Sequence, residues 1–166
     1  MLRRCRGRVL DIGCGAGRLV EALLHRGHPA LGIDVCPSAV ITTVRRGGAA
    51  LRCSVFDPVP DEGTWGTALL IDGNIGIGGD PGRLLRRIRD LVHGQGLLIV
   101  ETASGDVDER RRVRIHAGQR AVSGVFPWAV VGTTALGRYA RMSGWRPAER
   151  WTAGEHRHFV ALRACR

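Results

Sequence analysis

The chain has 166 residues, of which 44% are apolar, so it is long enough for one globular domain with a buried core and too short for two. Its formal net charge is +10, and all 25 basic residues are arginine. This composition favours a globular chain over a disordered one, and no apolar run approaches the roughly 18 residues that a membrane-spanning helix requires.

Cysteine usage and charge narrow the class of protein further. The five cysteines are scattered and form no C-x-x-C pair, which predicts neither a disulfide framework nor a metal site. The basic N-terminus precedes no apolar leader segment, so we expect a cytoplasmic protein with no membrane partner. Arginine without lysine, together with 24 glycines, indicates the codon bias of a GC-rich genome, and a nucleic-acid partner is therefore not favoured.

In the first half of the chain, apolar strands alternate with helical segments. Strands are predicted over 8–12, 30–35, 49–56 and 67–71. A helix begins at Arg18 and ends near Gly27, and a second runs from Pro37 to about Arg46. This order is typical of an α/β fold.

The second half adds an interruption and a hairpin. Asp80 and Pro81 open a helix that Gly94 closes, and a strand follows over 96–102. Residues 103–132 are expected to be an insert in which 110–115 pairs with 120–125. A helix capped by Thr133 or Thr134 then ends at Gly144, and strands over 145–152 and 157–162 are joined by a turn so short that they must be antiparallel. We therefore predict a single α/β domain over 1–166 with a doubly wound, mostly parallel sheet.

Three glycines, at 13, 15 and 17, lie between the first strand and the first helix. Such a loop lets the backbone approach a ligand closely, and several nucleotide-binding families share it. A dinucleotide fingerprint would need Gly or Ala at position 18, where this chain has Arg18, which disfavours a nicotinamide dehydrogenase.

The segment from Asp11 to Gly17 resembles motif I of the class I, Rossmann-like S-adenosylmethionine-dependent methyltransferases, and residues 65–80 resemble a subgroup from GC-rich bacteria. The resemblance implies a seven-stranded sheet of order 3-2-1-4-5-7-6 with an antiparallel edge strand. It also implies S-adenosyl-L-methionine as the cofactor. The helical segment that usually precedes the first strand is short here, so the cofactor crevice is expected to be less covered.

The resemblance and the chemistry of the cofactor together give candidate site residues. Asp11 would orient the ammonium, the glycine loop would receive the methionyl group, and Asp34 would bind the ribose. Ser54 occupies the position at which many members of this family have an acidic residue that binds the adenine amino group. Val35 and Val55 would lie on the two faces of the adenine ring. The expected cofactor-binding residues are Asp11, Gly13, Cys14, Gly15, Gly17, Asp34, Val35, Ser54, Val55 and Asp72.

Candidates for the acceptor side come from the loop after the fourth strand and from the insert. Because the strands before both glycine loops flank the topological switch point, Asp72 and Asn74 are expected to face the same crevice as Gly13. His116 is the histidine to test as a catalytic base, and a solvated position is its alternative. Phe126 and Trp128 are expected either to line an acceptor pocket or to anchor the insert.

The sequence therefore predicts methyl transfer, with a small-molecule acceptor as the leading hypothesis. An RNA or protein methyltransferase is the alternative that the charge suggests, and binding that weakens steeply with salt would distinguish an RNA substrate. A shortened relative that binds the cofactor without turnover is the third reading.

Overall fold

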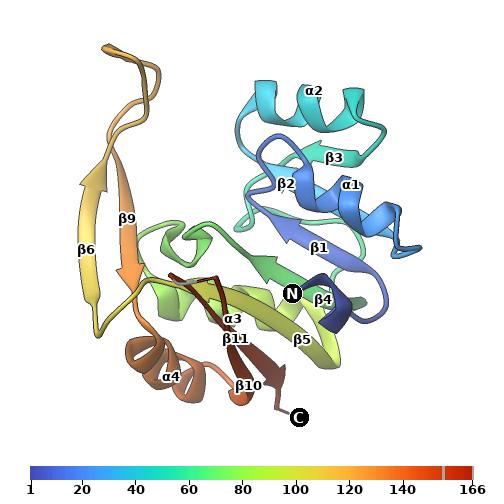
Figure 1. The fold of residues 1–166 in the computed structure, drawn as a ribbon, viewed down its shortest axis with the longest axis vertical. Coiled ribbons are helices and arrows are strands. Elements are labelled where there is room, and N and C mark those ends of the chain that lie inside the picture. The colour runs from blue at the N-terminus through green and yellow to red at the C-terminus, as the bar shows by residue number, and fades with distance from the viewer. Residues whose placement is uncertain (155, 166) are drawn as a thin grey trace.

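The computed structural model describes residues 1–154 and 156–165, which form a seven-stranded sheet, four α-helices and a protruding antiparallel ribbon (Figure 1). The elements of the first half are η1 (Leu2–Arg4), β1 (Val9–Ile12), α1 (Arg18–Leu24), β2 (Ala30–Asp34), α2 (Pro37–Arg45), β3 (Ala49–Arg52), β4 (Trp65–Leu70) and η2 (Asn74–Gly76). Those of the second half are α3 (Pro81–Leu91), β5 (Val92–Thr102), β6 (Asp108–Val113), β7 (His116–Ala117), β8 (Arg120–Ala121), β9 (Phe126–Val131), α4 (Thr133–Met142), β10 (Trp145–Ala153) and β11 (Arg157–Ala164).

The main sheet has seven strands in the order β3-β2-β1-β4-β5-β11-β10. The first five are parallel, as expected for a Rossmann-like α/β fold. The numbers of the last two strands differ from the expected order because the insert contributes four strands of its own. We expected the antiparallel strand to lie at the edge of the sheet, and this was wrong. The antiparallel strand is β11, which lies between β5 and the edge strand β10.

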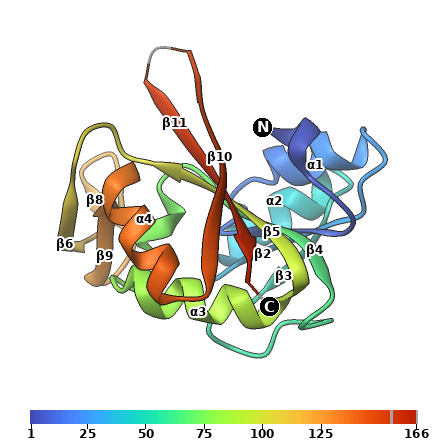
Figure 2. The same ribbon diagram turned by 90° about the horizontal axis from the view of Figure 1, so that it is seen from below.

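Helices cover both faces of this sheet (Figures 1 and 2), and an apolar cluster lies on each face. On one face, α3 and α4 bury side chains such as Leu85 and Leu136 against β4 and β5. On the other, α1 buries Val20 and Leu23, and η1 adds Met1 and Leu2. Because both faces are covered, the central strands are apolar almost throughout, which is the pattern that the sequence displays.

The N-terminal turn is attached to the far edge of the sheet. The guanidinium of Arg4 lies 4.1 Å from the ring centroid of Trp151 and forms an ion pair with Glu149, both on β10. Trp151 in turn stacks on Phe159 of β11, with centroids 5.4 Å apart. In the part of the chain that is described, no helix is long and apolar enough to cross a membrane.

The insert differs from the expected pairing. β6 pairs with β9 in an antiparallel ribbon, whereas the predicted partners 110–115 and 120–125 form no strand pair with each other. They are joined by a backbone hydrogen bond of 2.9 Å from Val122 to Ile115, next to the short β7–β8 turn at the tip of the ribbon. The pairing of β9 with β6 was not predicted because Phe126–Val131 directly precedes α4, and its apolar residues resemble the segment that enters a helix. The ribbon rises beside the carboxyl ends of β1 and β4 (Figure 1), and therefore faces the crevice in which ligands of such sheets bind.

Two local expectations about helix ends have different outcomes. Asp80 caps α3, since its carboxylate accepts a hydrogen bond of 2.9 Å from the backbone N–H of Arg83. The predicted threonine cap of α4 is wrong, because the N-cap is Gly132 and forms no side-chain capping bond. The hydroxyl of Thr133 instead lies 2.9 Å from that of Thr102 and ties α4 to the end of β5.

Candidate functional site

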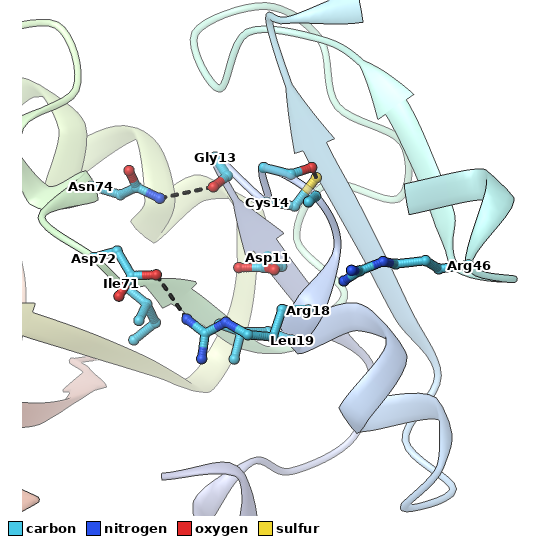
Figure 3. A pocket seen from close by; sticks show the side chains of 11 residues that line it. Asp11, Gly13, Cys14, Arg18, Leu19, Arg46, Ile71, Asp72 and Asn74 are labelled. Carbon is cyan, nitrogen blue, oxygen red and sulfur yellow. Dashed lines mark hydrogen bonds and ion pairs between the residues drawn. The ribbon is translucent and has the colours of Figure 1, made fainter. Parts of the chain in front are cut away.

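Two adjoining cavities lie at the carboxyl ends of β1, β2 and β4. The first, of about 480 Å³, is lined by the glycine loop, the start of α1 and the loop after β4 (Figure 3). The second, of about 390 Å³, lies toward β2 and β3 and is closed on its far side by the insert. Gly13 and Asn74 line both cavities, so together they form one extended groove.

Asp11 forms the floor of the first cavity (Figure 3). It is 2% exposed, and its Oδ2 has no hydrogen-bond partner among the described residues. Burial, reinforced by the carboxylates of Asp72 and Asp34 and opposed by the guanidinium of Arg18, raises the pKa of Asp11 to about 7. A buried carboxyl group without a partner requires a cation or a donor from outside the chain, and the ammonium of a ligand meets that need.

Asp34 is held in place at the end of β2. Its Oδ2 accepts a hydrogen bond of 2.9 Å from the N–H of Gly15, and its Oδ1 accepts one of 2.8 Å from the N–H of Cys36. These bonds tie the glycine loop to β2 and fix the carboxylate at the wall of the second cavity. Each oxygen keeps a further lone pair, which allows the carboxylate to accept from the two hydroxyls of a ribose.

The three glycines of the loop serve different purposes. A Cβ on Gly15 would meet no atom within 4 Å, so this residue presents bare backbone to the first cavity. A Cβ on Gly17 would lie 2.5 Å from the side chain of Thr43, and Gly17 lines neither cavity. Gly17, which we expected to bind the cofactor, therefore allows α1 to pack closely on α2. Cys14 lines the first cavity, but its thiol lies 3.9 Å from the hydroxyl of Thr43.

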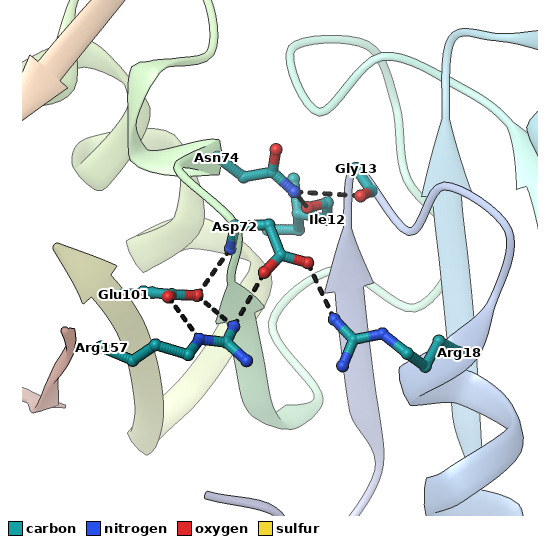
Figure 4. A network of polar contacts seen from close by, with 7 residues as sticks. All are labelled: Ile12, Gly13, Arg18, Asp72, Asn74, Glu101 and Arg157. Carbon is teal, nitrogen blue, oxygen red and sulfur yellow. Dashed lines mark hydrogen bonds and ion pairs between the residues drawn. The ribbon is translucent and has the colours of Figure 1, made fainter. Parts of the chain in front are cut away.

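Asn74 clamps the two glycine loops together. Its Nδ2 donates to the carbonyl oxygens of Ile12, at 2.8 Å, and Gly13, at 3.0 Å (Figure 4). Gly13 must be glycine here, because its φ is +71° and a Cβ would lie 2.6 Å from that Nδ2 atom. Both donors of the amide are thus used within the protein, and only its carbonyl oxygen remains for a ligand.

Asp72 belongs to a network of four charged groups at the ends of β1, β4, β5 and β11 (Figure 4). Its carboxylate pairs with Arg18 at 2.9 Å and with Arg157 at 2.8 Å, and Arg157 also pairs with Glu101 at 2.7 Å. The N–H of Asp72 donates to Glu101, which helps to hold the backbone in its left-handed conformation with φ of +55°. Asp72 remains largely exposed and lines the first cavity.

The residues expected around the adenine ring line the second cavity. Val35 and Val55 lie there with Ser54, whose Oγ already accepts a hydrogen bond of 3.2 Å from the N–H of Phe56. Val35 is 65% exposed, whereas Val55 is buried, so the two valines differ in how much surface a ligand would cover.

Arg87 on α3 binds the backbone of the loop that carries Ser54 and Val55. Arg87 donates to the carbonyl oxygens of Val55, at 2.9 Å, and Asp57, at 2.7 Å, and pairs with Glu62. This ion pair brings the pKa of the Glu62 carboxyl to about 2. The loop lacks secondary structure of its own and is held by Arg87 together with Arg83, whose guanidinium lies 4.4 Å from the ring centroid of Phe56.

We expect Arg87→Ala to loosen this loop and destabilise the protein by about 1–3 kcal/mol, because several charge-assisted hydrogen bonds are lost. Thermal unfolding measures the stability, and titration with S-adenosylhomocysteine should show weaker binding. Arg86→Ala, on the exposed side of the same helix, is the control. Equal melting temperatures and equal affinities for the two variants would contradict the role of Arg87.

The insert contributes Ile115, Phe126 and Trp128 to the second cavity. His116, the expected candidate base, is exposed on β7 at the tip of the ribbon and lines neither cavity. The sequence did not single out Glu101, Arg157 or Arg46 as site residues. Glu101 could have been found, because it lies near the carboxyl end of the central strand β5. Nothing in the sequence distinguishes Arg46 or Arg157 from the other arginines.

Comparisons with known proteins agree with this architecture. A family model described as a methyltransferase domain matches residues 2–163. The ubiquinone biosynthesis O-methyltransferase of Azorhizobium caulinodans is 30% identical over 112 residues, which are 64% of this chain and 44% of that enzyme. The chain therefore spans less than half the length of this curated relative.

Solved structures share the fold at lower identity. A methyltransferase from Bacteroides fragilis, in complex with S-adenosyl-L-homocysteine, has a TM-score of 0.81 at 23% identity, over 99% of this chain and 75% of that one. The 1,6-didemethyltoxoflavin-N1-methyltransferase of Burkholderia thailandensis has a TM-score of 0.70 at 21% identity, over 98% and 72%.

Proposed function

Since this chain belongs to the class I S-adenosylmethionine-dependent methyltransferases, we propose that it transfers the cofactor's methyl group to a small-molecule acceptor. The observation that carries the proposal is the unpartnered Oδ2 of Asp11, buried beside a glycine loop whose backbone at Gly15 is open. A carboxyl group in that position requires a cation, and the cofactor brings an ammonium.

The chain's own residues fit the parts of the cofactor in order along the groove. Asp11 and Asp72 would hold the ammonium, and Arg18 and Arg46, which line the same cavity, favour the carboxylate. Asp34 would bind the ribose, and Val35, Ser54 and Val55 would surround the adenine. The bound cofactor supplies a methyl group activated by a sulfonium, so the protein's task is mainly to orient the acceptor and exclude water.

A small acceptor is supported by the shape of the site. The ribbon of the insert bounds the groove, and its Trp128 lines both the cavity proposed for adenosine and a smaller cavity beside it, whose size suits a compact acceptor. The curated relative is named for ubiquinone biosynthesis, and one structural neighbour holds 1,6-didemethyltoxoflavin, so both names point to small acceptors.

Titration calorimetry with S-adenosylhomocysteine tests cofactor binding directly. We expect binding by the natural chain and a loss of about 10- to 100-fold in affinity for Asp34→Ala, because a charged group that accepts hydrogen bonds is removed. Asp106→Ala, a change at an exposed acid that lines neither cavity, should bind as the natural chain does. The absence of binding at millimolar ligand in a folded sample would contradict the proposed function.

A further inference from the structure

We propose that the acceptor is a flat aromatic molecule that stacks on the indole of Trp128 and presents a neutral nitrogen to the cofactor. This inference rests on the methyltransferase function proposed above. It adds the place of the acceptor, its shape and the class of its attacking atom.

A third cavity, of about 240 Å³, lies between β9 and the carboxyl ends of β4 and β5. Gly73 and Glu101 line it on one side and Trp128 on the other. Gly73 stands between Asp72 and Asn74, both of which line the cavity proposed for the methionyl group, so the two spaces meet at this loop. A Cβ on Gly73 would meet no atom within 4 Å, which leaves the junction open.

Trp128 is a fixed wall between this cavity and the one proposed for adenosine, since it lines both. Its backbone forms an isolated antiparallel bridge with Ile77, and its indole lies against Gly76, where a Cβ would be 2.5 Å from Nε1. Phe126 meets the indole edge to face, with centroids 6.0 Å apart and planes at 77°. A half-buried indole held in this way offers a flat, rigid surface on which an aromatic ring stacks.

The chemistry of the lining restricts the attacking atom. Glu101 is the one ionisable side chain among the described residues that line this cavity, and no histidine is among them. Both of its oxygens accept hydrogen bonds, from Arg157 and from the N–H of Asp72. Burial raises the pKa of Glu101, but these bonds and the charge of Arg157 outweigh it and hold the pKa below its usual value. Glu101 therefore stays ionised and is a poor base.

An acceptor in this cavity must then carry a free lone pair at neutral pH, as an aromatic ring nitrogen or an aryl amine does. The nitrogen lone pair forms the new N–CH₃ bond while the S–CH₃ bond breaks, and its electron pair remains on sulfur as a thioether. Positive charge moves to the nitrogen, near the carboxylates of Glu101 and Asp72, which stabilise it. A proton on that nitrogen, where present, leaves to water afterwards.

Isoquinoline and 2-naphthol have the same two-ring shape and differ in the attacking atom, so they test the inference. With S-adenosylhomocysteine bound, isoquinoline should quench the tryptophan fluorescence of the natural chain, and Trp128→Leu should bind it about tenfold more weakly or worse. Trp128→Phe, which keeps a ring, should lose no more than about threefold. Trp151→Phe, which removes an indole stacked on Phe159 at the far edge of the sheet, should bind isoquinoline normally.

Transfer from labelled S-adenosylmethionine completes the test, with N-methylisoquinolinium as the expected product and at least tenfold slower methylation of 2-naphthol. Equal rates for the two acceptors, or isoquinoline affinity unchanged in Trp128→Leu, would overturn this inference and leave the proposed function intact. If the natural chain binds S-adenosylhomocysteine but neither acceptor, the inference also falls. Failure to bind S-adenosylhomocysteine would overturn the proposed function, and the inference with it.

Discussion

The affinity for S-adenosylhomocysteine should rise about tenfold between pH 6 and pH 8. Asp11 has a pKa of about 7 in the free protein, and only its ionised form can pair with the ligand's ammonium. The ionised fraction grows from roughly one tenth to roughly nine tenths over this range, and apparent affinity scales with that fraction. Calorimetry in buffers of different ionisation enthalpy should detect the proton that binding releases near pH 7.

Asp11→Asn should abolish both the pH dependence and most of the binding. The amide cannot carry the charge that the ammonium requires, so affinity at pH 8 should fall on the order of 100-fold. Asp106→Asn changes an exposed acid outside both cavities and serves as the control. A flat pH profile in the natural chain, or equal affinity in Asp11→Asn, would show that Asp11 does not hold the ammonium.

The same carboxyl group also links pH to the stability of the free protein. Its folded pKa lies above the unfolded value near 4, so the folded state binds the proton more tightly. Folding stability should therefore fall as pH rises from about 4 to about 7, by an amount on the order of 4 kcal/mol at most, and should then level off. The stability of Asp11→Asn should lack this decline, which chemical denaturation at several pH values would reveal.

The first half of the fold could be predicted from the sequence because its signals are local. β1, β2 and β4 are buried almost throughout and mainly apolar, apart from Asp11 in β1 and Asp34 at the end of β2, and Pro37 marks the first turn of α2. The ribbon could not be predicted in this way, because its pairing joins residues about twenty positions apart. Its strand β6 is exposed and rich in arginine. No periodicity distinguishes such a strand from a solvated loop.

The residues of the candidate site also divide into those with a local sequence signal and those that only the fold brings together. Asp11 and Gly15, which a motif of fixed spacing marks, and Asp34, at the end of β2, line a single groove. The network of Asp72, Arg157 and Glu101 joins residues up to 85 positions apart, and only the folded sheet brings them together. The glycines after β4 were predicted to face a ligand, yet two of them, Gly76 and Gly79, lack a Cβ because β9 packs there.

Gly76→Ala should therefore displace the insert and abolish acceptor methylation. The new Cβ would lie 2.2 Å from the carbonyl oxygen of Ala129 and 2.5 Å from Nε1 of Trp128, and the first contact is with buried backbone that cannot rotate away. We expect β9 to shift, at a cost of about 1–3 kcal/mol, and Trp128 to move with it. Trypsin should then cleave the arginine-rich ribbon faster, and methyl transfer should fall by at least 100-fold.

Cofactor binding separates this effect from general unfolding. Asp11 and Asp34 lie on β1 and β2, which pair with β3 and β4 and not with β9, so S-adenosylhomocysteine should still bind Gly76→Ala. Because Trp128 also lines the adenosine cavity, the affinity for S-adenosylhomocysteine should fall, but by far less than the rate of methyl transfer. Gly124→Ala is the matched control, since its Cβ would meet no atom within 4 Å in the same insert. Normal turnover by Gly76→Ala would show that acceptor methylation does not depend on the position of β9 against Gly76. Binding without turnover would instead separate the two halves of the site, with the parallel sheet holding the cofactor and the insert holding the acceptor.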